Sequence, residues 1–377
     1  MNLNELIKTL VGKERDKEGI HVRSSLRPQI FSYERCEYFD TLARLILGKG
    51  DVCIAMCCHN DQLLYSSNRG EVTNYADNCL NILKKFANNS QKKSEYLMLV
   101  DKVIGKVLEV DSSRTTGYKE IATFKNAVMD YNRKKDNQDL SVDDKFNMLV
   151  VVSSYAQVAH DKIKENKQLA TELESQNKQR AAKGIENKAN RAWDCLVPWH
   201  DLNTIVNAIK DDTMLSQNSK NLIRMIKEGK FRKINSRTTM HAEMKLIDHL
   251  IIGKANIGSP RHIGISKLAC CPCQVTINTL NKPDSYDDCF RNCGTHGGTY
   301  HGWVVPTTLK GKKFSKELRS IEKEFQELTQ QDEHQMFPKV RETTSKIPSD
   351  LAGMPIFGNE EELNQGQLST QIQIPPK

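Results

Sequence analysis

Two short motifs that stand far apart in the sequence constrain this chain more than any other feature. The first, His241-x-Glu243, heads an apolar run, and the second, Cys270-x-x-Cys273, follows the apolar stretch 262–268. Imidazole and thiolate groups are common zinc ligands, and three of them leave one position of a tetrahedral zinc ion open. If His241, Cys270 and Cys273 bind one ion, the fold must bring both motifs to a single point.

The residue types in these motifs suit metal-assisted chemistry. A bound zinc ion lowers the pKa of its water toward neutrality, so that a nucleophile is available without a strong base. Cysteine binds metal as a thiolate, which a helix N-terminus favours, and a helix opening at Cys270 would place Cys273 on the same face. The pair Thr238-Thr239 offers an N-cap for the helix that carries His241. Glu243 is not needed as a ligand and is predicted to carry protons.

A closed structural zinc site is the alternative interpretation. Two further cysteines follow the second motif, and together they complete a Cys₄ set: Cys270, Cys273, Cys289 and Cys293. Such a site has no open coordination position, so the chain would then be a binding protein without catalysis. The predicted order of helix, strand and C-x-x-C at a helix start favours the open, catalytic arrangement.

Composition sets broad limits on the chain. Its 377 residues suffice for one large domain or two, and the net charge of +8 is compatible with a polyanionic partner without identifying one. Eleven clustered cysteines, with no basic segment and apolar run at the N-terminus, predict a reducing, cytoplasmic location and no signal peptide. No run approaches the roughly 18 apolar residues of a membrane span. Delivery by an export machine that reads other signals stays open.

The apolar spacing divides the chain into five parts. Residues 36–70 are expected to form a helix and a β-hairpin, and residues 237–330 the second part of the same core with the zinc site. Between them, 71–236 is predicted to be an all-helical insertion. A helical extension, 1–35, precedes the core, and the polar tail 331–377 is expected to be disordered.

Within the insertion, apolar residues recur at helical spacing. The predicted helices are 75–88, 94–109, 120–135, 142–188, 202–210 and 218–228. Pro198, between Trp193 and Trp199, is expected to break the pattern, and Gly184 to end or bend the long helix before it. The insertion either shapes a substrate channel or binds a protein partner, or it is a separate helical domain without a part in catalysis.

A strip of basic residues precedes the first motif, with only Glu228 opposing it. Its members are Lys220, Arg224, Lys227, Lys230, Arg232, Lys233 and Arg237. One interpretation is a solvated helix face followed by a basic loop. The other is a surface that contacts phosphates beside the zinc site, which would position a nucleotide or nucleic acid without reading its bases.

Four motifs together resemble a known family. They are H-A-E-M-K at 241–245, S-K-x-x-C-x-x-C at 266–273, G-x-H-G…G-W…P at 294–306, and an early L-A helix with a strand–turn–strand unit at 42–68. In these the chain resembles the cytidine-deaminase-like superfamily of zinc-dependent deaminases, most closely a little-characterised branch of bacteria and fungi. The resemblance covers about 36–70 and 237–330. Ala269 departs from the proline that many members have there.

The resemblance implies a three-layer α/β/α fold with a sheet of four or five strands. Its order is helix, two antiparallel strands, H-x-E helix, strand, C-x-x-C helix, strand and helix, with the large helical insertion after the second strand. No clear fifth strand follows the last helix in the sequence. One catalytic zinc ion would be bound by His241, Cys270 and Cys273, and Glu243 would move protons.

The same resemblance implies a substrate and a reaction. Asn68, at the end of the second strand, His296 and Trp303 would contact the substrate, with Trp303 stacking on a base. The reaction would be hydrolytic deamination of a nucleobase, cytosine rather than adenine, in a nucleotide or a single-stranded nucleic acid. Branches of this kind include nucleic-acid-editing toxins and effectors, so that role is expected as well.

Overall fold

The computed structural model describes residues 3, 5–9, 37–48, 53–68, 74–89, 93–110, 118–235, 240–252, 261–267, 269–282, 290–292 and 303–330. Several sequence predictions fall outside these residues: the tail 331–377, most of the extension 1–35, and the residues Thr238, Thr239, Arg237, Cys289, Cys293 and His296.

The predicted hairpin is confirmed. Strands β1 (Ile54–His59) and β2 (Gln62–Ser67) pair antiparallel, with Ile54 opposite Ser67 and His59 opposite Gln62. The two residues between them, Asn60 and Asp61, both have positive φ, at 47° and 55°. This is the two-residue turn whose twist matches that of the flanking strands, and Asn and Asp tolerate the left-handed conformation better than other residues.

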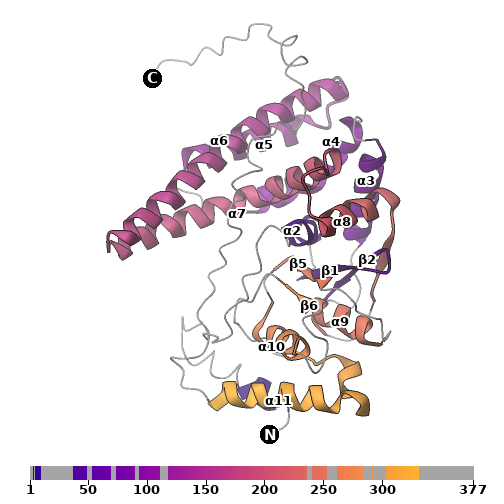
Figure 1. The fold of residues 1–377 in the computed structure, drawn as a ribbon. Coiled ribbons are helices and arrows are strands. Elements are labelled where there is room, and N and C mark those ends of the chain that lie inside the picture. The colour runs from indigo at the N-terminus through magenta and orange to yellow at the C-terminus, as the bar shows by residue number, and fades with distance from the viewer. Residues whose placement is uncertain are drawn as a thin grey trace.

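A mixed sheet is built around this hairpin (Figure 1). Its order is β3-β2-β1-β5, with β3 (Phe231–Lys233) parallel to β2 and β5 (Gly264–Ile265) antiparallel to β1. Directly before β5, β4 (Arg261–His262) pairs in parallel with β6 (Phe290–Arg291). The Ile263 N–H between β4 and β5 donates to the Arg291 carbonyl at 2.6 Å. The segment 261–265 therefore has β1 on one side and β6 on the other.

Helices pack on both faces of the hairpin. Ile54 and Met56 of β1 belong to a large apolar cluster with α2 (Glu37–Leu45) and the helices of the insertion. The alternate residues Ala55 and Cys57 belong to a second cluster with α9 (Ala242–Ile252) and α10 (Cys271–Leu280). Side chains alternate across a strand, so β1 serves both cores. Figure 1 shows α2 on one side of the strands and α9 and α10 on the other.

Six helices lie between β2 and β3. They are α3 (Asn74–Asn88), α4 (Lys93–Glu109), α5 (Lys119–Lys134), α6 (Val142–Ser175), α7 (Gln179–Lys210) and α8 (Gln217–Glu228). Helices α3, α4, α5 and α8 each begin one residue before the predicted start. The segment is helical as expected except at its end, where Gly229 closes α8 with a φ of 69° and the chain turns into β3. Three strand residues are too few to show a period in the sequence.

Two boundaries inside the insertion differ from the prediction. Helix α6 ends at Ser175, where Asn177 takes a φ of 59° and reverses the chain, and α7 then runs without interruption through Gly184 and Pro198. The expected break around Pro198 is wrong. Trp193 and Trp199 on either side are each 1% exposed. Their burial offsets the lost backbone hydrogen bond, so tertiary packing overrides the local preference.

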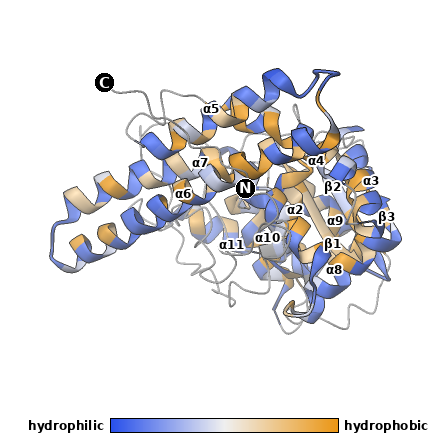
Figure 2. Cartoon of the chain, turned by 90° about the horizontal axis from the view of Figure 1, so that it is seen from above, coloured by the Kyte–Doolittle hydropathy of each residue, from blue (hydrophilic) through white to orange (hydrophobic). Residues whose placement is uncertain are grey.

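Helices α6 and α7 form an antiparallel pair that extends away from the sheet (Figures 1 and 2). Figure 2 shows hydrophobic and hydrophilic residues alternating along both helices, as expected when one face of each is buried. Within the described residues, no helix has the length and apolar character that crossing a bilayer requires.

Two histidines lie where α6 meets α7, His160 buried and His200 partly buried, and we expect them to make stability depend on pH. The rings of His160 and His200 lie 6.2 Å apart and nearly parallel, and the His200 ring is 5.0 Å from Trp193. Burial lowers the pKa of His200 to about 4, whereas an unfolded histidine titrates near 6.5. As pH falls from about 6.5 to 4, only the unfolded chain gains this proton. The free energy of unfolding should therefore fall by up to about 3 kcal/mol.

Urea unfolding at several pH values between 7.5 and 4.5 measures this effect. The variant His200→Gln should lose less stability over the interval than the wild type, because it has no such group to protonate. Equal losses in the two proteins would contradict the prediction.

The basic strip before the first motif is matched by carboxylates from elsewhere in the fold. Arg224 pairs with Asp61 at 2.7 Å, Lys227 with Asp212 at 3.2 Å, Lys230 with Glu228 at 2.7 Å and Lys233 with Asp77 at 3.4 Å. Two of these partners, Asp61 and Asp77, are distant in sequence. Strand β3, which carries part of the strip, is at the opposite edge of the four-stranded sheet from β5. These contacts favour an ion-paired surface over a strip that contacts phosphates.

Candidate metal centre

The structure brings the two motifs together. The Nδ1 atom of His241 lies 3.4 Å from the sulfur of Cys270 and 3.4 Å from that of Cys273, and the two sulfurs are 3.3 Å apart. A carboxylate oxygen of Glu243 joins them in a group whose atoms all lie within 4.8 Å of one another. Tetrahedral zinc, with bonds of about 2.3 Å to sulfur and 2.0–2.1 Å to nitrogen, separates such ligand atoms by about 3.6–3.8 Å. The three donors are within a few tenths of an ångström of that arrangement, so they fit a zinc ion.

Two helix starts position the donors. His241 directly precedes α9, and its carbonyl accepts the first helical hydrogen bond, from the Lys245 N–H at 3.0 Å. Cys270 is the N-cap of α10, with extended backbone angles, and its carbonyl accepts from the Gln274 N–H. Pro272 stands in the first turn, where no N–H is required. The prediction that C-x-x-C opens a helix is confirmed, and both helix N-termini favour negative charge at the site.

The donors influence one another's pKa values. Burial alone would raise the pKa of the Cys270 thiol, but hydrogen bonds with Cys273 and His241 bring it down to about 7. Burial disfavours the charged imidazole, yet contact with the Cys270 sulfur raises the pKa of His241 to about 8. Burial together with the neighbouring Cys270 sulfur raises the pKa of Cys273. Both cysteines must be thiolates and the imidazole neutral to bind a metal ion, so metal binding would displace the protons that these groups hold.

Glu243 is a carboxylate beside the donors. It is in the first turn of α9 and is 3% exposed. Its negative charge contributes to the raised pKa of both Cys273 and Cys53, after the larger effect of burial. The carboxylate thus lies within electrostatic reach of a ligand sulfur on one side and of the residue before β1 on the other.

The end of β2 is tied to the first turn of α9 by two buried hydrogen bonds. The Ser66 hydroxyl donates to the Ala242 carbonyl, and the Lys245 ammonium donates to the Ser67 carbonyl, both at 2.7 Å. Lys245 is 2% exposed. Sequence reasoning missed the roles of Ser66 and Lys245, although Lys245 belongs to the H-A-E-M-K motif. These bonds fix the strand end relative to the helix that carries His241 and Glu243.

Asn68 lies at the same strand end. Its side-chain oxygen accepts from the Cys53 N–H at 3.1 Å, and its own N–H donates to the Cys53 carbonyl at 3.3 Å. The side chain thus closes the open end of the hairpin. Contact between Asn68 and substrate stays a prediction, as does any role of His296, which lies outside the described residues.

A glycine lets α2 approach the strand that leads into the second motif. A Cβ atom at Gly264 would lie 2.5 Å from the carbonyl carbon of Phe39. Next to it, the Asp40 carboxylate accepts from the Ile265 N–H at 2.6 Å, and the Ser266 hydroxyl accepts from the Ile54 N–H at 2.9 Å. The close packing of α2 on β5 fixes where the chain enters the turn before Cys270.

We expect Gly264→Ala to lower the free energy of unfolding by about 1–3 kcal/mol, because the added methyl group overlaps backbone atoms that cannot move aside. Gly184→Ala is the matched control, since a Cβ at this position in α7 meets nothing within 4 Å. The control should be neutral or stabilise the chain by up to about 1 kcal/mol. Chemical denaturation measures both, and a Gly264→Ala protein as stable as the wild type would contradict the packing argument.

The Trp303 side chain is buried and contacts Cys273, one of the proposed metal-binding residues. Its indole N–H donates to the Cys273 sulfur at 3.1 Å, and the side chain is 3% exposed. The ring packs against Phe325 of α11 (Ser315–Gln330), with centroids 5.9 Å apart. Stacking of Trp303 on a base stays a prediction, and the observed geometry gives the side chain a contact that the sequence did not indicate.

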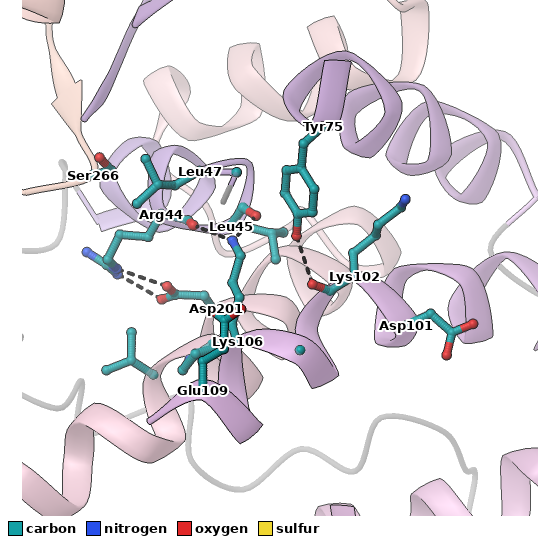
Figure 3. A pocket seen from close by; sticks show the side chains of 14 residues that line it. Arg44, Leu45, Leu47, Tyr75, Asp101, Lys102, Lys106, Glu109, Asp201 and Ser266 are labelled. Carbon is teal, nitrogen blue, oxygen red and sulfur yellow. Dashed lines mark hydrogen bonds and ion pairs between the residues drawn. The ribbon is translucent and has the colours of Figure 1, made fainter. Parts of the chain in front are cut away.

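A cavity lies beside Ser266, the residue that follows β5 (Figure 3). It has a volume of about 560 Å³ and lies between the end of α2 and helices α3, α4 and α7 of the insertion. Arg44 and Asp201 form a two-bond ion pair in its wall, and Lys106 donates to two carbonyls at the end of α2. Ser266 also lines the cavity, and its hydroxyl lies 3.7 Å from the Cys53 sulfur. Among the residues described near the metal group, Ser266 is the one that lines the cavity, and the four residues of the group itself do not line it.

Comparison with known families agrees with this geometry. A family model described as OTT_1508_deam-like deaminase matches residues 240–307. This segment is deaminase-like. It contains all four residues of the metal group together with Trp303, and it excludes the insertion. No curated protein and no solved structure matched the chain.

Proposed function

We propose that the chain is a zinc-dependent hydrolytic deaminase acting on a nucleobase in a nucleotide or nucleic acid. The observation that carries the proposal is the convergence of His241, Cys270 and Cys273 at separations that fit one ion, with Glu243 beside them. The deaminase-like match to the same segment supports it. Helices on both faces of β1 support the three-layer α/β/α fold that this function would use.

The reaction exchanges the exocyclic amino group of a base for an oxygen. When bound, zinc would supply a water of lowered pKa at the open position. His241, Cys270 and Cys273 would hold the ion. Glu243 would take a proton from the water and pass it to the ring nitrogen, and a second proton to the departing amine. A carbon–oxygen bond forms, the carbon–nitrogen bond breaks, and ammonia leaves.

The cavity beside Ser266 offers room for the part of the substrate beyond the base. Its volume falls in the usual range of small-molecule sites, roughly 300–1,000 Å³. A base at the metal centre and a remainder reaching past Cys53 and Ser266 would use both regions. The preference for cytosine over adenine, the toxin or effector role, and the cytoplasmic location rest on the sequence resemblance, and we keep them as proposals.

A substrate survey tests the proposed function. Zinc-loaded protein is incubated with pooled nucleosides, nucleotides, single-stranded DNA and RNA, and deaminated positions are mapped by mass spectrometry and sequencing. Protein with Glu243→Ala serves as the control. We expect ammonia release and a mass increase of about 1 Da per base with the wild type alone, since an NH₂ group is replaced by OH or by its keto tautomer. Deamination of equal extent by the Glu243→Ala protein would contradict the proposal.

A further inference from the structure

The three tryptophans of the chain differ in what their indole N–H groups contact. All three side chains are buried: Trp193, Trp199 and Trp303. Within the described residues, the indole N–H groups of Trp193 and Trp199 have no hydrogen-bond partner, whereas that of Trp303 lies 3.1 Å from the Cys273 sulfur. Indole nitrogen can only donate, so the Trp303 contact has one direction, from the ring to the sulfur.

We propose that Trp303 is a positioning residue of the metal centre, whose N–H holds the Cys273 thiolate and withdraws electron density from it. This inference rests on the proposed function, because it requires a metal ion bound to Cys273. A thiolate that donates less density to the ion leaves the ion more electron-poor. Such an ion would supply water of a lower pKa.

The contact would strengthen once Cys273 ionises to bind a metal ion. Hydrogen bonds to ionised groups are shorter and stronger than those between neutral groups, and a neutral thiol is a weak acceptor. A second hydrogen bond to sulfur lies close by, since the Ser266 hydroxyl is 3.7 Å from the Cys53 sulfur. The Trp303 donor approaches its sulfur more closely, at 3.1 Å, so the indole is already placed to stabilise the charge that Cys273 would carry as a ligand.

Helix α11 holds the donor in place. Phe325 is fully buried, its ring contacts Trp303 with an interplanar angle of 55°, and both belong to the apolar cluster that includes Cys270 and Cys273. Through this contact α11 would influence the metal while Phe325 contributes only apolar surface.

Cobalt substitution tests the inference without measuring turnover. Cobalt(II) bound by thiolates shows charge-transfer absorption from sulfur to metal, and its energy depends on the electron density at sulfur. We expect Trp303→Phe to shift this absorption and to lower zinc affinity about 10- to 100-fold in competition with a chromophoric chelator. Trp199→Phe is the matched control, because it makes the same change at a buried indole without a partner. It should leave both readings at the wild-type values.

The outcomes separate this inference from the proposed function. A wild-type protein with no sulfur-to-cobalt absorption would overturn both. Wild-type absorption that Trp303→Phe leaves unchanged, with unchanged zinc affinity, would overturn this inference alone. Phe325→Leu is a second variant, which keeps the indole N–H but removes the ring that packs against Trp303. We expect it to shift the sulfur-to-cobalt absorption in the same direction but by less. If Trp303→Phe does not fold, an unshifted Phe325→Leu spectrum overturns the inference.

Discussion

Glu243→Gln should remove turnover while leaving zinc bound. Glutamine keeps the size of the buried side chain and its place in the first turn of α9, but it cannot take a proton from water. General acid–base catalysis contributes about 10²- to 10⁴-fold, so we expect kcat to fall by at least that range. Zinc content, measured by atomic absorption, should stay at the wild-type level because the three ligand side chains are unchanged.

The control for this experiment is Glu228→Gln. Glu228 is a partly exposed carboxylate in α8 that pairs with Lys230, and it belongs to another part of the fold. Its replacement should leave kcat unchanged. A Glu243→Gln enzyme with wild-type turnover would show that another group moves the protons and would end the assignment of Glu243.

His241→Ala should abolish zinc binding and activity together. The Nδ1 atom of His241 is the only nitrogen donor of the group, and its removal leaves two sulfurs to hold the ion. Cys270→Ser should have an equally large effect, because a serine hydroxyl is a poor substitute for a thiolate ligand. Since a bound metal stabilises the folded state, the thermal midpoint measured in zinc should also fall in both variants.

Cys289→Ser and Cys293→Ser distinguish the open site from a closed Cys₄ site. If His241 completes the ligand set, both serine variants keep zinc at the wild-type ratio. If Cys289 and Cys293 are ligands, the two serine variants lose zinc, whereas the His241→Ala variant keeps it. That second pattern would overturn the catalytic interpretation in favour of a binding protein with a structural metal.

Local spacing explains why much of the site could be predicted. An imidazole and a carboxylate two residues apart at a helix start, and two thiols three residues apart at another, are fixed by helix geometry once each helix forms. The starts of α3, α4, α5 and α8 followed from the helical period of their apolar residues. Asn60 and Asp61, which form the hairpin turn, are residue types that tolerate its positive φ.

Packing between distant segments explains what could not be predicted. Pro198 stays inside α7 because the neighbouring tryptophans are buried against other helices. The free energy of that burial depends on tertiary contacts, so it cannot be inferred from the local sequence. Strand β3 exists because β2 offers an edge to a short segment after α8. The carboxylates that balance the basic strip, such as Asp61 and Asp77, are far from it in sequence.

The sequence by itself determined the kinds of donor, their spacing and the helices that begin at them, since these depend on neighbours a few residues apart. Only the tertiary structure decided that His241 meets the two sulfurs, that the Trp303 N–H points at Cys273, and that Ser266 lines a cavity beside the insertion. The physical reason is that such contacts join segments whose separation is set by how apolar faces pack, and many packings are compatible with the same local pattern.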